Sequence, residues 1–182
     1  FYEPKYRILY SILFALFLGL VAYNLDPPVT YDLYRHHELV LDAMRYAGTI
    51  DVGRLISDGS EPLQALTIYL VSLTKDPNML QFSLVSLGYA ILLFCIGDYA
   101  KRNNIRKRTL LLVLAFTLSS FTAINFFSGL WNYIAMLIFS LGFYLDIYRN
   151  KPRWMVYPLY LMTPFIHSGM FFPVVLLIIF KV

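Results

Sequence analysis

The stretch LQFSLVSLGYAILLFCIGDY, residues Leu80–Tyr99, decides the fold class of this chain. It contains one acidic side chain and no basic one. About 20 mostly apolar residues suffice for a helix to cross the roughly 30 Å of hydrocarbon in a bilayer. The basic segment Lys101–Arg108 follows almost at once. Because basic residues concentrate on the cytoplasmic side of a membrane, this pattern predicts a transmembrane helix that ends in the cytoplasm.

The 182-residue chain as a whole is also unusually apolar. It is 59% hydrophobic and 14% charged, whereas soluble domains average about 45–50% apolar and about 25% charged residues. Four further apolar blocks are long enough to span or nearly span a bilayer: Ile8–Leu25, Thr109–Phe127, Trp131–Tyr148 and Met155–Phe180. Three prolines interrupt the last block, which therefore predicts either one broken span or two half-helices. We expect an all-α transmembrane helix bundle with five or six spans, which forms one membrane domain over residues 1–182.

Two shorter elements are predicted between the first and second full spans. Apolar residues recur at helical spacing over Tyr31–Gly48, which indicates an amphipathic helix on the membrane surface or against the bundle. Pro62–Leu73 is apolar but would reach only about 18 Å as a helix, so we expect it to be half-inserted. The intervening Asp51–Ser60, with its two glycines, is predicted to be a loop.

The basic residues support one topology. If Pro62–Leu73 does not cross, most of the chain's 15 basic residues lie on one side of the membrane. These are Lys5, Arg7, the five bases of 101–108, Arg149, Lys151 and Arg153. We therefore expect a cytoplasmic N-terminus and an extracytoplasmic segment 26–78. The net charge of +4 is then explained by inner loops near anionic lipid, and no nucleic-acid partner is expected.

Candidate chemistry begins in the predicted outer segment, where Asp32 and Arg35 are three residues apart. Arg35 has the planar fork of donors that suits phosphate, and Asp32 is positioned to orient or deprotonate a hydroxyl. The alternative is a solvated helix face with intrahelical ion pairs. The adjacent His36 and His37 would point about 100° apart on a helix, so they do not predict a metal site, and no cofactor is expected.

Three more residues are candidates for a functional site. Glu61 precedes the half-inserted helix, where it is either a stabilising first-turn acid or a carboxylate held near a lipid-linked substrate. Arg54 could meet the diphosphate of such a lipid. His167 lies within an apolar block, where an ionisable group is costly and suggests function; the alternative is a neutral histidine bonded to a carbonyl freed by a nearby proline.

The order of these motifs resembles the EpsG-type group of bacterial polysaccharide polymerases, relatives of the Wzy O-antigen polymerases. A first span precedes Tyr31-Asp-Leu-Tyr-Arg35, a Glu61-Pro-Leu-Gln64 helix start, two spans joined by a basic loop, Trp131-Asn-Tyr-Ile-Ala135, and Ile166-His-Ser168. Members typically carry an arginine at the position of Trp131. The chain is about half the length expected for the family, so we expect it to be a partial chain.

The resemblance implies transfer of a growing glycan from an undecaprenyl-diphosphate carrier onto a lipid-linked repeat unit at the outer face of the bacterial cytoplasmic membrane. Asp32, Glu61 and His167 would then be catalytic, and Arg35, Arg54, Trp131 and Asn132 would bind substrate, although Trp131 could instead be an interfacial anchor. Partners would be the lipid-linked oligosaccharide, membrane lipid and other glycan-assembly membrane proteins. Two alternatives stay open: a transferase that adds one sugar from a polyprenyl-phosphate donor, and a non-catalytic membrane subunit or transporter.

Overall fold

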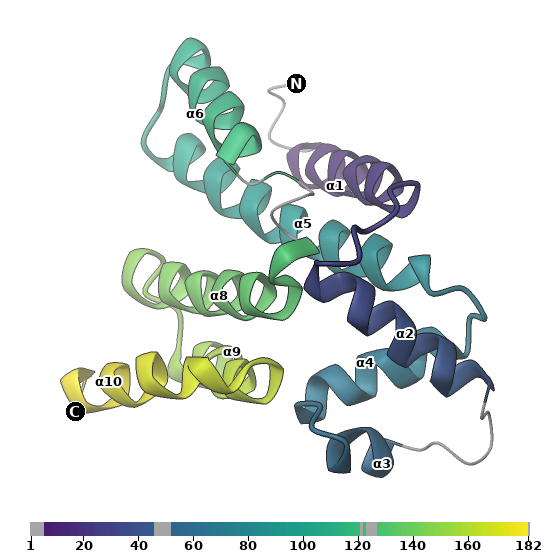
Figure 1. The fold of residues 1–182 in the computed structure, drawn as a ribbon. Coiled ribbons are helices and arrows are strands. Elements are labelled where there is room, and N and C mark those ends of the chain that lie inside the picture. The colour runs from purple at the N-terminus through teal and green to yellow at the C-terminus, as the bar shows by residue number, and fades with distance from the viewer. Residues whose placement is uncertain (1–5, 46–51, 121, 123–126, 182) are drawn as a thin grey trace.

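The computed structural model describes residues 6–45, 52–120, 122 and 127–181, and in this part of the chain every regular element is a helix (Figure 1). In chain order these are α1 (Arg7–Tyr23), α2 (Asp32–Arg45), α3 (Val52–Ser57), α4 (Pro62–Ser72), α5 (Asn78–Arg102), α6 (Lys107–Ser120), α8 (Leu130–Phe143), the π-helix η1 (Tyr144–Tyr148), α9 (Arg153–Ile166), the 3₁₀-helix η2 (Ser168–Met170) and α10 (Phe171–Lys181). The prediction of an all-α fold is confirmed.

Each predicted apolar block contains a helix, but the helices differ in length. Two described segments are long and apolar enough to cross a membrane: Asn78–Arg102, and Leu130–Tyr148, which joins α8 to η1. At 1.5 Å per residue their 25 and 19 residues reach about 37 and 28 Å. The helices over Ile8–Tyr23 and Pro62–Ser72 are apolar but shorter. The count of five or six spans therefore stays a prediction.

The last apolar block forms two helices. α9 ends at Ile166, His167 has an extended backbone, and η2 leads into α10. α10 turns back along α9, where Val174 packs with Val156 and Tyr160 (Figure 1). Pro164 cannot donate a backbone hydrogen bond to Tyr160 O, four residues earlier. The Thr163 hydroxyl donates to that carbonyl instead, at 2.8 Å.

α1 packs closely along α5 through small residues. Ala15, Gly19 and Ala22 occupy the buried stripe of α1, and small residues at such positions allow two helix backbones to approach. Gln81 of α5 then caps α1, since its Nε2 donates to the carbonyl oxygens of Ala22, Tyr23 and Leu25 at 2.7, 3.1 and 3.0 Å. This contact fixes the end of α1 from which the chain continues into α2.

The segment between the two predicted spans is largely helical. α2 confirms the predicted amphipathic helix as far as Arg45; residues 46–51 lie outside the described part. Its buried side chains are Leu33, His36, His37, Val40 and Ala43. The predicted loop over 51–60 is wrong in part, because Val52–Ser57 forms α3. Burial of Leu55 against the neighbouring α4 favours this turn of helix, and Gly59, at φ +98°, follows it.

The close approach of α1 and α5 makes a prediction about Gly19. A Cβ atom added there would lie 2.9 Å from the Phe82 carbonyl oxygen and 1.9 Å from Ser86 Oγ. The serine can rotate but the backbone carbonyl cannot, so Gly19→Ala should destabilise the fold by about 1–3 kcal/mol. Thermal unfolding in detergent measures this. Gly129→Ala is the control, since its nearest neighbour would be 3.9 Å away, and equal stability losses would contradict the close contact.

Candidate functional site

The first group of candidate residues lies at the N-terminal end of α2. The Asp32 carboxylate accepts from Arg35 Nη2 at 2.7 Å through Oδ1, and its Oδ2 lies 3.3 Å from His36 Nε2. The Arg35 side chain is 73% exposed and that of Asp32 is 26% exposed. Both line an open recess of about 410 Å³, together with Val29, Thr30, Tyr31 and Ser128. An anion entering this recess would meet Arg35 beside an acceptor carboxylate.

His36 joins this group to α8. Because a carboxylate only accepts hydrogen bonds, His36 Nε2 carries the proton that faces Asp32. The buried His36 ring packs edge-to-face against Trp131, with the ring centroids 5.6 Å apart. Trp131 is itself only 3% exposed. It therefore supports the His36–Asp32 pair from behind, and its ring face is not open to solvent.

The hydrogen bond with His36 holds the pKa of the Asp32 carboxyl below its usual value, against the opposing effect of desolvation. The charge of His36 and then the charge and hydrogen bond of Arg35 lower this pKa further. An acid with a lowered pKa stays ionised at neutral pH and is a weak base. The geometry consequently suits Asp32 to accept a hydrogen bond from a hydroxyl and to orient Arg35, more than to take up a proton.

The second group joins α4 to the break between α9 and α10. Glu61 Oε1 accepts from the Ser168 backbone N–H at 3.1 Å. One turn later Gln64 Nε2 donates to the Ile166 carbonyl at 2.6 Å, and this bond is buried. These contacts hold the Glu61 carboxylate next to the residue that follows His167. The sequence predicted Glu61 and His167 as separate candidates, and the fold bonds Glu61 to the backbone of the residue that follows His167.

The His167 imidazole is half-buried and lies over Gly169. A Cβ atom added to Gly169 would sit 3.2 Å from His167 Nε2, so the glycine leaves room for the ring. No described residue bonds to the imidazole, and the second oxygen of Glu61 also lacks a protein partner in the described part of the chain. Both groups thus keep hydrogen-bonding capacity for a ligand.

The remaining candidates lie apart from these contacts. Arg54 is exposed on α3, where its carbonyl accepts from the Ser57 hydroxyl. Asn132 is exposed on the first turn of α8. Among the described residues no group of three histidine, cysteine or acidic side chains is arranged to hold a metal ion.

The two groups are neighbours through the helices that carry them. α4 contacts both α2 and α9, and α8, which bears Trp131, contacts η2. No hydrogen bond or ion pair between described residues joins Asp32, Arg35 or His36 directly to Glu61 or His167. A substrate that engages both groups would therefore have to extend from one to the other.

Comparison of the chain with protein-family models, with curated proteins and with solved structures gave no match.

Sequence reasoning missed two residues that build this site. Gln64 and His36 were noted in the sequence but received no role there. Helical spacing does place Gln64 one turn after Glu61, on the same face, and His36 one turn after Asp32. That spacing identifies which residues share a helix face. It does not identify the Ile166 carbonyl that Gln64 bonds to, or the Trp131 indole that His36 packs against.

The lowered pKa of His37 predicts how the stability of the fold depends on pH. Burial lowers its pKa below the usual 6.5, opposed by the negative charges of Asp76 and Asp26 and reinforced by His36. An unfolded chain therefore binds a proton near pH 6.5 that the folded chain resists, so stability is full above that pH and falls on acidification. Asp32 does not contribute between pH 7.5 and 5.5, since its pKa is lowered from 3.8.

Thermal unfolding in detergent at pH 7.5 and 5.5 checks this expectation. The midpoint of the unmodified protein should be lower at pH 5.5, and His37→Leu should remove at least half of that decrease. A pH dependence that is the same in the variant and the unmodified protein would assign it to other groups.

Proposed function

We propose that the chain is part of an integral membrane protein. The two helices long enough to cross are only 50% and 39% buried over their apolar windows, whereas a core helix of a soluble protein is buried on most sides. Large apolar side chains also stand exposed on other helices, including Phe17 on α1, Phe116 on α6 and Phe180 on α10. Apolar surface of this extent suits contact with lipid.

The proposed topology places the N-terminus in the cytoplasm of a bacterial cell and residues 26–78 outside its cytoplasmic membrane. The positive-inside pattern of the basic loops supports it. So does the bond from Arg149 to Asp98 in the last turns of α5, which brings the basic residues 149–153 to the same end of the bundle as the basic segment 101–108. In this topology five or six segments enter or cross the bilayer, with α4 inserted from the outer side.

The proposed activity is glycan polymerisation: a growing chain leaves its undecaprenyl-diphosphate carrier and joins the terminal hydroxyl of a lipid-linked repeat unit. In this glycosyl transfer the acceptor hydroxyl loses a proton and the lipid diphosphate departs as an anion. The reaction needs a group that accepts the proton, cations near the leaving group, and a fixed orientation of the hydroxyl. The family resemblance of the motifs supports this assignment.

The observation that carries the proposal is the Glu61–Ser168 hydrogen bond, which holds a carboxylate beside His167. Glu61 and His167 are the proposed pair that positions and deprotonates the acceptor. Asp32 orients Arg35, and Arg35 with Arg54 provides positive charge for the diphosphate. Trp131 acts through His36 as a positioning residue, while Asn132 is the exposed candidate for contact with the sugar.

Lipid-linked intermediates, resolved by mass in cells that lack the full-length gene, test the activity. Loss of polymer with accumulation of one complete repeat unit is the expected result. A repeat that lacks one sugar would indicate a single-addition transferase in place of a polymerase. An unchanged profile would overturn both enzymatic assignments and favour the non-catalytic subunit or transporter.

Glu61→Gln and His167→Ala, introduced into the full-length gene, should each lower polymer at least a hundredfold, since acid–base groups contribute about 10²–10⁴-fold. Glutamine keeps the oxygen that accepts from Ser168 N–H, so the fold is preserved. Glu38→Gln, on the exposed face of α2, is the control and should leave polymer unchanged. Normal polymer from both site variants, at normal protein levels, would contradict the proposed pair.

Arg35 and Arg45 form a matched pair on α2. Each is bonded to an aspartate three residues earlier, at 2.7 Å for Asp32 and 3.4 Å for Asp42, and both arginines are exposed. Only Arg35 lines the recess. Arg35→Gln should therefore lower polymer tenfold or more, while Arg45→Gln should not. If the two variants give equal polymer, Arg35 does not contact the diphosphate.

A further inference from the structure

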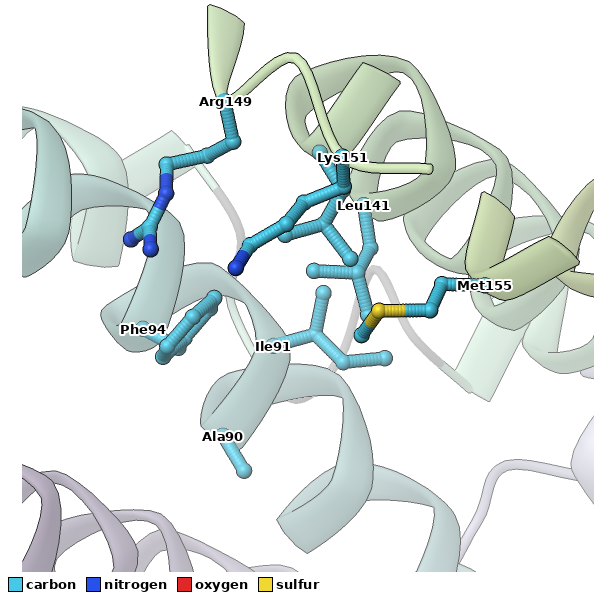
Figure 2. A pocket seen from close by; sticks show the side chains of 8 residues that line it. Ala90, Ile91, Phe94, Leu141, Arg149, Lys151 and Met155 are labelled. Atoms are coloured by element: carbon cyan, nitrogen blue, oxygen red, sulfur yellow. The ribbon is translucent and has the colours of Figure 1, made fainter. Parts of the chain in front are cut away.

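A second recess lies between α5, η1 and the start of α9, at the end of the bundle away from the Gln81 cap of α1. It has a volume of about 400 Å³, within the range of about 300–1,000 Å³ typical of small-molecule sites. Its floor is apolar and includes Ile91, Phe94 and Met155, and two cationic side chains, Arg149 and Lys151, stand at its rim (Figure 2). An apolar recess with a cationic rim matches an amphiphile with an anionic head.

Asp98 fixes one of the two cations. It is 5% exposed and accepts from Arg149 Nη1 at 2.8 Å, from the Tyr144 hydroxyl at 2.7 Å and from Arg102 Nε at 3.1 Å. One carboxylate thus serves two guanidinium groups. Arg149 is held rigidly at the rim with donors left over, because a guanidinium has five N–H groups.

Lys151 is the second cation, and no described carboxylate lies within ion-pair distance of its ammonium group. Asn150 adopts a left-handed backbone, at φ +46°, and the Lys151 N–H then donates to Leu145 O at 2.9 Å. This turn sends the Lys151 side chain back over the recess, where it extends toward Phe94 (Figure 2). The rim therefore carries a positive charge that no carboxylate of the described residues neutralises.

The charge around the recess is predominantly positive. Residues 98–108 and 144–153 together contain eight basic and two acidic side chains. In the proposed topology this end faces the cytoplasmic leaflet, whose anionic lipids attract such segments, and basic pockets between transmembrane helices bind their headgroups.

We propose that this recess binds an anionic phospholipid, with the headgroup phosphate between Lys151 and Arg149 and an acyl chain along Ile91, Phe94 and Met155. The proposal rests on the membrane placement, but not on glycan polymerisation. A bound lipid would join α5 to the start of α9 where the protein itself leaves a gap.

The test uses the full chain in vesicles of phosphatidylcholine or phosphatidylglycerol with identical acyl chains. Trp154 is 75% exposed and adjoins Met155 of the recess, so brominated forms of each lipid report contact by quenching its fluorescence. Phosphatidylglycerol should associate more tightly than phosphatidylcholine. Lys151→Gln should reduce that preference about fivefold, as expected for one lysine near an anionic headgroup.

Lys101→Gln is the matched control, because it removes the same charge at the same end but does not line the recess. It should reduce the preference less than Lys151→Gln does, because it removes only the general attraction of the basic segment for anionic lipid. Equal association of the two lipids, or an equal effect of both variants, would overturn the lipid site and leave the membrane placement intact. Failure of the protein to float with either vesicle would overturn the membrane placement itself.

Discussion

The two hydrogen bonds between α4 and the α9–η2 junction determine whether the candidate site exists. α9 ends at Ile166, and His167 has an extended backbone. The end of a helix leaves backbone carbonyls without intrahelical partners. Gln64 supplies a donor to the Ile166 carbonyl in a buried position, where an unpaired carbonyl would cost about 1–3 kcal/mol. Glu61 then binds the first free N–H of η2. The break in α9 is thus stabilised by the same residues that place a carboxylate next to its histidine.

Hydropathy predicted the helices because each of them lies in a long apolar block. Three prolines in the last block predicted a break there. The contacts between blocks could not be predicted in this way. Gln64 and Ile166 are 102 residues apart, and a glutamine within an apolar helix has no periodic signal that indicates its partner. Similarly, a tryptophan such as Trp131 is typical of an interfacial anchor, but in the fold Trp131 is buried against the His36 ring. The local hydropathy pattern determines where a helix forms, whereas the packing of the helices determines which polar residues of different helices contact one another.

Asp98 shows the same limit at the opposite end. Its sequence neighbours are basic, and Arg102, four residues later, donates to it. The fold adds Tyr144 and Arg149, which come from a segment about 50 residues away. Removing the Asp98 carboxylate and most of the Arg149 side chain from water is costly unless the two groups satisfy one another. This cluster therefore fixes the ends of α5 and η1 together and separates a rigid basic end from the Glu61–His167 end.

The two arginine environments differ in what they can do for a ligand. Arg149 bonds to a carboxylate that is 7% exposed in its side chain, so withdrawing it would strand a buried charge. Arg35 bonds to Asp32 while 73% of its own side chain faces solvent, and exposed ion pairs of this kind contribute only about 0–1 kcal/mol. In the proposed reaction, the lipid diphosphate would consequently recruit Arg35 at little cost in stability, with Asp32 kept ionised by His36 behind it. The exposed pair is suited to exchange partners during a reaction, and the buried one to hold the helices in place while it happens.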